Sequence, residues 1–245
     1  MKNKNNWIPT KFEFHHGQWR ASRNPQQLAI GSRLVADLTA MWYANHLVVY
    51  AKGQLLDLGC GNVPFFGMYQ TYIVDNTCVD WGGSLHGSTY LDIAHDLTKT
   101  LPFPDEKFDT ILLSDVLEHI PEPLKLFHEM SRVLSKGGRI ILNVPFFYCL
   151  HESPHDYYRY TEFALRRFAE QANLNIIQLD RSGGSIDVLV DITSKHLQFI
   201  PFGGVFFATL FQKIAIGFGR TKWGQKIRNI TAKNFPLGYF MVLEK

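Results

Sequence analysis

The sequence predicts a doubly wound α/β fold, in which a mainly parallel sheet carries helices on both faces. Short apolar runs alternate along the chain with longer stretches whose apolar residues have helical spacing. Each short run is apolar almost throughout, which is typical of parallel strands that are buried on both faces. The length of 245 residues suits one such domain with an appended part.

The elements follow in order along the chain. Residues 1–24 are expected to form an irregular arm, anchored by the aromatic side chains of Trp7, Phe12, Phe14 and Trp19. Residues 25–50 have helical spacing, with a break at Gly31. Strands are expected at 54–58, 77–80, 108–113, 139–144, 174–179 and 236–243, and helices at 121–134 and 161–172. Residues 135–138 are expected to cap the helix before them.

One apolar segment departs from this alternation. Residues 197–218 contain a single charged residue, Lys213, yet Pro201 and two glycines interrupt them too early for a spanning helix. We expect either a hydrophobic lid or core segment over the pocket, or a patch that contacts a membrane surface or a second copy. The expected organisation is an N-terminal cap over 1–50, a binding core over 51–180, and the rest of the same domain over 181–245.

Composition narrows the class of protein. Lys and Arg number 25 and Asp and Glu 22, so the net charge of +3 gives no strong reason to expect a nucleic-acid partner. Three Cys without CxxC spacing argue against a disulfide scaffold and a structural zinc site. The polar start of the sequence lacks the apolar core of a signal peptide, so we expect a cytoplasmic protein.

The candidate binding site follows the first strand, at the carboxyl end of the sheet. The strand contains Asp57 and ends in Gly59-Cys60-Gly61, where the two glycines let the backbone approach a ligand closely. Asp80 ends the second strand, where a carboxylate can accept both hydroxyls of a ribose. Pro64 occupies the third glycine position of the dinucleotide motif GxGxxG, so a nucleoside without a pyrophosphate fits better than NAD.

These segments resemble the class I S-adenosylmethionine-dependent methyltransferases, and are most similar to the small-molecule branch called type 11. The resemblance covers about residues 50–180 and is carried, in order, by LLDLGCGN, CVDW, LDIAHDLTKTLPFPDEKFDTILLSDVLEHIPEP and VLSKGGRIILNVP. It implies a Rossmann-like, seven-stranded sheet whose last strand is antiparallel. It also implies methyl transfer from S-adenosylmethionine to a small molecule, which we expect to be partly apolar or sugar- or lipid-like.

The resemblance assigns residues to the methionine half of the cofactor. Gly59 and Gly61 are expected to pass under this half, and Asp57 to position its amino end. Ser114 and Asp115, after the strand at 108–113, are expected to face the sulfonium.

A second group is assigned to the nucleoside half. Asp80 is expected to bind the ribose hydroxyls, with the apolar face of Trp81 beside the ribose or adenine. Asp96 is expected to accept the adenine amino group, and the backbone N–H of Leu97 to reach a ring nitrogen.

The acceptor side is expected in residues 145–160, a loop at a strand's carboxyl end that is dense in polar aromatic side chains. His151 or His155 is the candidate base for an acceptor that must lose a proton. Three neighbours are candidates to orient the acceptor: Tyr157, Tyr158 and Arg159. In the alternative interpretation these side chains hydrogen-bond the start of the next helix. No metal site is expected, because Pro154 keeps the two histidines off one helical face.

Two other functions stay open. A catalytically silent module would keep the fold, with or without the cofactor. Two features leave room for it: Val63, followed by Pro64, replaces the family's frequent third glycine and stiffens the loop, and no residue is an unambiguous base. An NAD-dependent oxidoreductase would share the sheet but is disfavoured by Pro64. Titration with NAD and with S-adenosylmethionine distinguishes an oxidoreductase from a methyltransferase.

Overall fold

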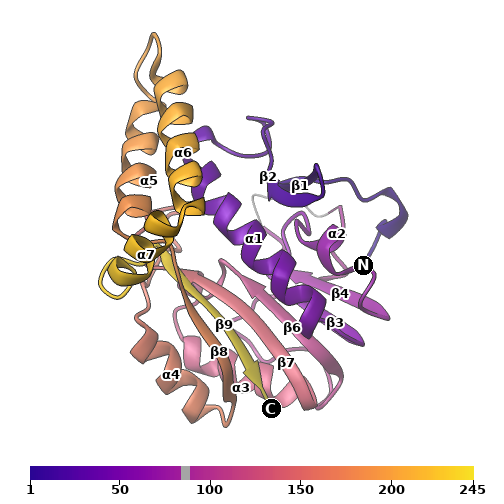
Figure 1. Cartoon of the computed structure of the whole chain (residues 1–245). Helices are drawn as coiled ribbons and strands as arrows, with labels where there is room; N and C mark the ends of the chain where they lie inside the picture. Colours follow the sequence, from indigo (N-terminus) through magenta and orange to yellow (C-terminus); the bar gives the residue numbers. More distant parts are fainter. Residues whose placement is uncertain (84–88) are drawn as a thin grey trace.

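A computed structural model describes residues 1–83 and 89–245, and a seven-stranded sheet forms its centre (Figure 1). The strands of this sheet are β3 (Gln54–Leu58), β4 (Asp75–Asp80), β5 (Ile93–Ala94), β6 (Phe108–Ser114), β7 (Leu134–Pro145), β8 (Asn175–Ser182) and β9 (Gly238–Glu244). Their spatial order is β5-β4-β3-β6-β7-β9-β8. All neighbours up to β7 are parallel, and β9 is antiparallel to both β7 and β8. The predicted fold class and the antiparallel last strand are confirmed.

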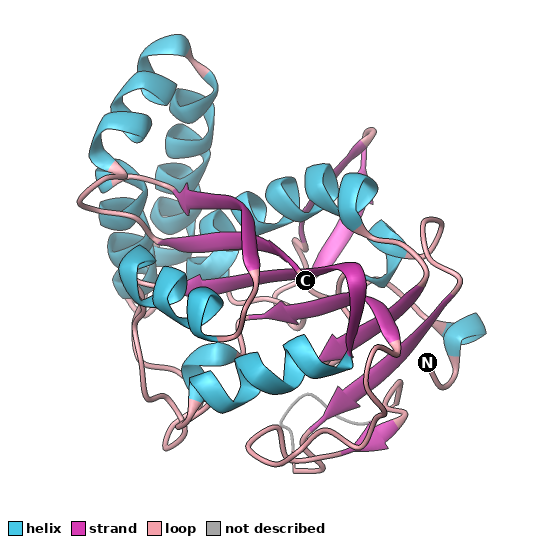
Figure 2. Cartoon of the chain, turned by 90° about the horizontal axis from the view of Figure 1, so that it is seen from below, coloured by secondary structure: helices cyan, strands magenta, loops and turns pink. Residues whose placement is uncertain are grey.

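Helices cover both faces of the sheet (Figure 2). α1 (Arg33–Tyr50) and α2 (Phe66–Tyr69) pack on one face, and α3 (Pro123–Val133) and α4 (Glu162–Gln171) on the other. Successive strand residues point to opposite faces, so Leu55 joins the buried cluster under α1 and Leu56 the one under α3. This two-sided burial is why the strands read as continuous apolar runs. The expected break at Gly31 is a 3-10 turn, η2 (Ile30–Ser32), directly before α1.

The N-terminal arm is more ordered than expected. After the short turn η1 (Lys4–Asn6), it forms an antiparallel hairpin of β1 (Phe12–His15) and β2 (Gln18–Ala21). The two turn residues, His16 and Gly17, have φ of 48° and 77°, as a tight hairpin turn requires. Three of the four aromatic anchors pack inward, but Phe14 is 60% exposed.

The predicted cap at 135–138 is wrong. β7 begins at Leu134, directly after α3, and its pairing with β6 passes from Leu134 to Arg139. Residues 135–138 therefore form a bulge in the strand. The carbonyl of Lys245 accepts the Gly137 N–H at 3.0 Å, so the far end of β9 holds this bulge in place.

Two further helices project from the sheet as a hairpin. α5 (Ser185–Leu197) and α6 (Gly204–Arg220) lie antiparallel beside the start of α1, and α7 (Lys222–Thr231) leads back to β9 (Figure 1). The segment 197–218 is thus half of a protruding hairpin, whose large side chains are exposed. In the described part of the chain, no helix has both the length and the apolar character needed to cross a membrane.

Candidate active site

A cavity of about 800 Å³ opens at the carboxyl ends of β3, β4 and β6, a volume suited to a small-molecule ligand. All eight residues predicted to hold the cofactor line it: Asp57, Gly59, Gly61, Asp80, Trp81, Asp96, Leu97 and Ser114. They come from separate segments of the chain, so the fold gathers the predicted groups around one volume. Their individual contacts with a cofactor stay predictions.

The glycine turn is fixed to the end of β4. Gly59 and Gly61 have φ of 68° and 50°, and the N–H of Gly59 donates to the Val79 carbonyl at 2.8 Å. The N–H of Gly61 donates to Asp80 Oδ2 at 2.7 Å. A side chain at Gly59 would be blocked, because its Cβ would lie 2.3 Å from Val116 Cγ2. The turn therefore requires glycine for both its backbone conformation and its packing.

Val63 adopts the conformation that a glycine would adopt. Its φ is 49°, an unfavourable value for a β-branched residue, and its side chain is fully buried. The indole N–H of Trp7 donates to the Val63 carbonyl at 3.1 Å. The N-terminal arm thus helps to hold the loop in a shape that its own side chain disfavours.

The two acidic residues of the first strands have different surroundings. Asp80 is half-buried, and its Oδ1 accepts the Trp81 N–H at 2.6 Å. Asp57 is 4% exposed and its Oδ2 accepts the Tyr69 hydroxyl at 3.2 Å. Burial raises the pKa of Asp57 to about 7, even though the hydrogen bond from Tyr69 lowers it. A cationic amino group bound beside Asp57 would stabilise its ionised form.

At the predicted adenine end, Asp96 and Leu97 lie together in one turn. Oδ1 of Asp96 accepts the Thr98 N–H at 2.9 Å, and hydrogen bonds from Thr98 lower the pKa of Asp96. Asp96 is exposed and Leu97 is buried, while Trp81 opposite is 53% exposed.

A hydrogen-bonded group fixes the end of β6. The hydroxyls of Ser114 and Tyr43 both donate to Asn143 Oδ1, at 2.6 and 2.7 Å. The Asn143 amide in turn donates to Asp115, whose other oxygen pairs with Lys11 at 3.2 Å. Lys11 belongs to the N-terminal arm and lines the cavity. Nothing in the polar sequence around Lys11 indicated this position.

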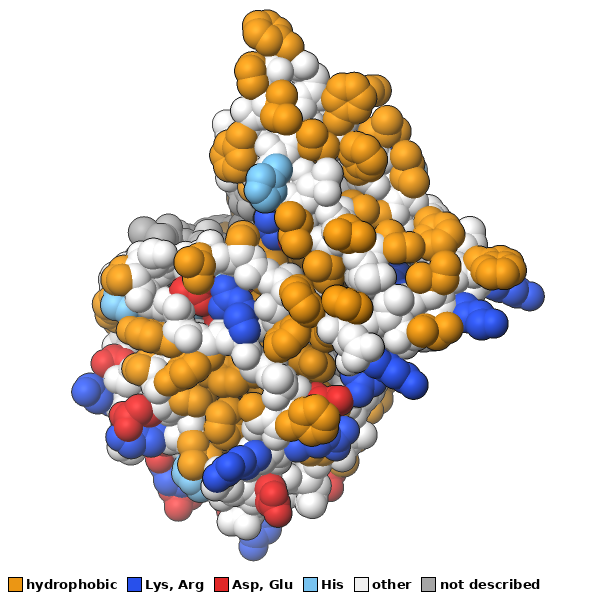
Figure 3. Space-filling view, turned by 90° about the vertical axis from the view of Figure 1, so that its left-hand side faces the viewer, with side chains coloured by type: hydrophobic (Ala, Val, Ile, Leu, Met, Phe, Trp, Pro, Cys, Tyr) orange, Lys and Arg blue, Asp and Glu red, His pale blue; other side chains and the backbone are white. Residues whose placement is uncertain are grey.

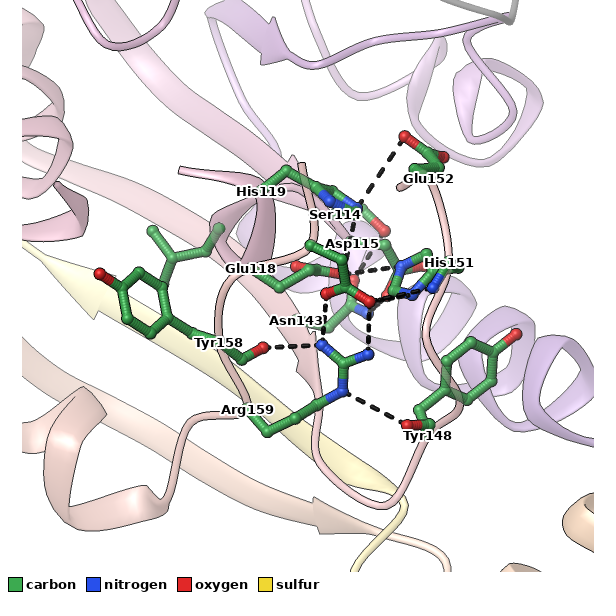
Figure 4. A network of polar contacts seen from close by, with 12 residues as sticks. Ser114, Asp115, Glu118, His119, Asn143, Tyr148, His151, Glu152, Tyr158 and Arg159 are labelled. Atoms are coloured by element: carbon green, nitrogen blue, oxygen red, sulfur yellow. Dashed lines mark hydrogen bonds and ion pairs between the residues drawn. The ribbon is translucent and has the colours of Figure 1, made fainter. Parts of the chain in front are cut away.

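His151 is held between two carboxylates (Figure 4). Its Nε2 lies 3.5 Å from Oε1 of the fully buried Glu118, and its Nδ1 lies 3.3 Å from Asp156 Oδ2. Burial lowers the pKa of His151, but the hydrogen bond to Glu118 and the charges of both acids outweigh this and raise it. The two carboxylates therefore favour the protonated form of the His151 imidazole.

His155 is placed differently. It lines the cavity, is exposed, and its Nδ1 lies 3.2 Å from the Tyr157 hydroxyl. Its ring meets Trp81 edge-on at 5.2 Å between centroids, so it stands beside the predicted nucleoside position. Both candidate bases line the cavity, and the role of either as a base stays a prediction.

Tyr158 and Arg159 do not belong to the cavity lining. The Tyr158 hydroxyl donates to the Pro121 carbonyl at 2.9 Å. Arg159 binds both oxygens of Asp156, at 2.6 and 2.7 Å, and holds the pKa of that carboxyl well below its usual range (Figure 4). These contacts tie the loop to itself and to the segment before α3 rather than to the start of α4, whereas Tyr157 lines the cavity.

One cluster in the described part of the chain has the composition of a metal site. Ligand atoms of Glu118, His119 and His151 all lie within 4.8 Å of one another. It differs from the His151–His155 pair considered from the sequence. Within this cluster, Glu118 Oε1 lies 3.5 Å from His151 Nε2 and 3.8 Å from His119 Nε2.

Comparison with known proteins agrees with this geometry. Residues 56–142 match the family model described as "Methyltransferase domain". An uncharacterized methyltransferase of Mycobacterium avium is 33% identical over 137 residues, which cover 51% of the chain and 54% of that protein. The chain thus spans about half the length of this curated relative.

Solved structures of low sequence identity share the fold. A SAM-dependent methyltransferase from Archaeoglobus fulgidus is 13% identical, with a TM-score of 0.56 over 87% of this chain and 97% of its own. The [4+2]-cyclase SpnF is 16% identical, with a TM-score of 0.55 over 96% of this chain and 88% of its own.

The strand order is that of the fold these solved structures share, and the cavity lies at the carboxyl ends of β3 and β4. Residues 56–142 match a methyltransferase domain, and the curated relative that is 33% identical over 137 residues is itself named a methyltransferase.

Proposed function

We propose that this protein transfers a methyl group from S-adenosylmethionine to a small molecule that is partly apolar or sugar- or lipid-like. The observation that carries the proposal is the single cavity shared by the glycine turn, Asp57 and Asp80. These groups suit a ligand with a ribose at one end and a cationic amino group at the other. The fold alone does not fix the reaction, since a cyclase shares it.

The residues present fit the cofactor. Asp80 would hold the ribose, because its carboxylate lines the cavity beside the glycine turn, to which the Gly61 N–H ties it. Asp57 would face the amino group, and Ser114, fixed through Asn143, would lie near the sulfonium. When bound, S-adenosylmethionine supplies an activated methyl group for in-line displacement.

The chain's own contribution is then position, exclusion of water and proton transfer. The cavity continues past the cofactor residues toward α1 and the loop after β7, where Leu28, Val35, Tyr148 and Leu237 provide apolar surface. Ser32 and Thr39 add hydroxyls to the same wall. This mixed lining supports an acceptor with apolar and polar parts, and His155 at its edge would accept the proton that such an acceptor loses.

Val63 bears on the silent-module alternative. The loop keeps a glycine-like φ of 49° at this position, and the cavity stays open. The substitution of the third glycine therefore does not remove the space for a cofactor, and only methyl transfer to an acceptor distinguishes the active enzyme from the silent module.

Calorimetric titration with S-adenosylmethionine, S-adenosylhomocysteine and NAD tests the proposal. We expect one-site binding of both sulfur nucleosides and no binding of NAD. Incubation of the protein with tritium-methyl S-adenosylmethionine and cell extracts should then label a component of the lipid or the aqueous fraction. Binding of NAD alone would indicate the oxidoreductase instead, and cofactor binding without label in any fraction would indicate the silent module.

The pKa of Asp57 predicts a pH dependence of cofactor binding. Since the pKa of the buried carboxyl is raised to about 7, it is largely protonated below that pH and cannot pair with the cofactor's amino group. We expect the Kd for S-adenosylmethionine to rise up to about tenfold for each pH unit below 7. Calorimetry between about pH 5.5 and 7.5 measures this, and Asp57→Asn should bind weakly with a flat profile. A flat profile in the unaltered protein would contradict the assignment of Asp57.

A further inference from the structure

The α5–α6 hairpin is built with its large apolar side chains on the outside. The buried positions of α6 are small or polar: Gly204, Ala208, Gln212, Ala215 and Gly219. Its exposed positions include large apolar residues: Val205, Phe206, Phe207, Leu210, Phe211 and Ile214. A helix on the surface of a soluble protein normally has the opposite arrangement. The outer face of α6 therefore suits an apolar environment outside the protein.

The tip of the hairpin continues this apolar surface. In the turn between α5 and α6, Phe199 is 81% exposed and Phe202 is 102% exposed. The space-filling view shows hydrophobic side chains along the whole projecting hairpin (Figure 3). On α7, Trp223 is 75% exposed. Apolar surface of this extent marks an interaction site.

The charges of the same region have one sign. Between Ile192 and Leu243 the sequence contains no Asp or Glu but seven Lys or Arg. Two of these form internal ion pairs, Lys195 with Asp191 and Arg228 with Asp187. The other five are exposed and form no ion pair with any residue that the structure describes: Lys213, Arg220, Lys222, Lys226 and Lys233. A cationic border thus accompanies the apolar face.

We propose that the α5–α6 hairpin and α7 dock the protein on the surface of an anionic lipid bilayer. The aromatic tip enters the boundary between headgroups and acyl chains, and the unpaired Lys and Arg lie against anionic headgroups. A second copy of the chain fits this surface less well. In a two-fold dimer the same cationic segments would face each other and repel.

The hairpin is close to the cavity. Lys195 of α5 lies over the ring of Tyr148, 3.6 Å from its centroid, and Tyr148 lines the cavity. α7 leads to Gly238, which pairs with Pro145 at the carboxyl end of β7. Docking would bring the cavity near the bilayer, so that an acceptor carried in the membrane could reach it. This last step rests on the proposed methyl transfer, whereas the docking itself does not.

Cosedimentation with vesicles tests the docking, in the absence of any cofactor. The full chain is mixed with vesicles of phosphatidylcholine alone or with added phosphatidylglycerol. We expect binding to the anionic vesicles at least about tenfold stronger than to phosphatidylcholine, and weaker binding as salt is raised. Failure of methyl transfer would not affect this measurement.

Variants locate the contact. The triple change Phe199→Ser, Phe202→Ser and Phe206→Ser should lower vesicle affinity at least about tenfold, and so should the pair Lys222→Gln and Lys226→Gln. Phe163→Ser on α4 is the matched control, since Phe163 is 73% exposed and lies outside the hairpin. Circular dichroism checks the fold, and the single change Phe202→Ser serves if the triple variant does not fold.

Two outcomes would overturn the proposal. One is vesicle binding that is absent, or equal for the unaltered protein and the aromatic variants. The other is a dimer, detected by light scattering, that the aromatic changes dissociate while vesicle binding is absent, which would assign the face to a second copy.

Discussion

Replacing Asp80 by alanine is expected to lower the affinity for S-adenosylmethionine by at least about 100-fold, since hydrogen bonds to a charged group contribute about 1.5–3 kcal/mol each. The carboxylate would lose its bonds to two ribose hydroxyls. It would also lose the bond from the Gly61 N–H, at 2.7 Å, that fixes the glycine turn. Calorimetric titration of the two proteins with the cofactor measures the difference.

Two further variants make this result specific. Asp80→Asn keeps an acceptor for one hydroxyl and should lose affinity less than the alanine variant. Asp75→Ala is the matched control, since Asp75 begins the same strand and has a side chain that is 61% exposed. Equal affinity of the unaltered protein and Asp80→Ala would place the ribose elsewhere and remove the basis for the neighbouring assignments.

The Gly59→Ala change is expected to destabilise the protein by about 2–5 kcal/mol, from backbone strain and overpacking together. Gly59 has a φ of 68°, and an added Cβ would lie 2.3 Å from Val116 Cγ2. For a protein of this size we expect a fall in Tm of roughly 5–15 °C. Thermal unfolding followed by circular dichroism measures it.

The backbone and steric contributions can be separated. Gly137 has a φ of 71° with nothing within 4 Å of an added Cβ, so Gly137→Ala should show the backbone cost alone, about 1–2 kcal/mol. Adding Val116→Ala to Gly59→Ala should recover part of the loss, because it removes the atoms that clash. If Gly59→Ala cost no more than Gly137→Ala, Val116 would not constrain the turn.

The sheet and the cofactor side of the site could be predicted because local sequence determines them. A strand buried on both faces must be apolar throughout, so β3 was predicted with its observed bounds, Gln54–Leu58. Asp57 interrupts that apolar run, and an acidic residue inside a buried strand indicates a specific binding partner. In the structure, Asp57 lines the cavity. Residues at the carboxyl ends of neighbouring parallel strands then meet by topology alone.

What the sequence did not reveal depends on contacts between distant segments. The hairpin of the arm turns at His16-Gly17, which is weaker than the usual Asn-Gly signal. The bulge after Leu134 is held by a hydrogen bond from the Gly137 N–H to the carbonyl of Lys245, which is distant in the sequence. The pKa of His151 is raised because the fold places Glu118 and Asp156 beside its imidazole.

The orientation of α6 also could not be predicted from the spacing of its apolar residues. Apolar spacing indicates a helix but not which face turns inward when apolar residues surround it. The small residues at 204, 208, 215 and 219 were the available signal, since they allow close approach to the neighbouring helices α5 and α7.

The strand order has a consequence for biosynthesis. β8 is attached to the sheet through β9, which lies between β7 and β8 and is made after all of α5, α6 and α7. During translation β8 therefore emerges without its pairing partner, while the strands from β3 to β7 can already assemble. β9 inserts between β7 and β8 and pairs with both, although it is far from each of them in the sequence. Such long-range pairing is slow, so we expect it to be a late step of folding. The ribosome must therefore have translated nearly all of this sequence before the sheet can be completed.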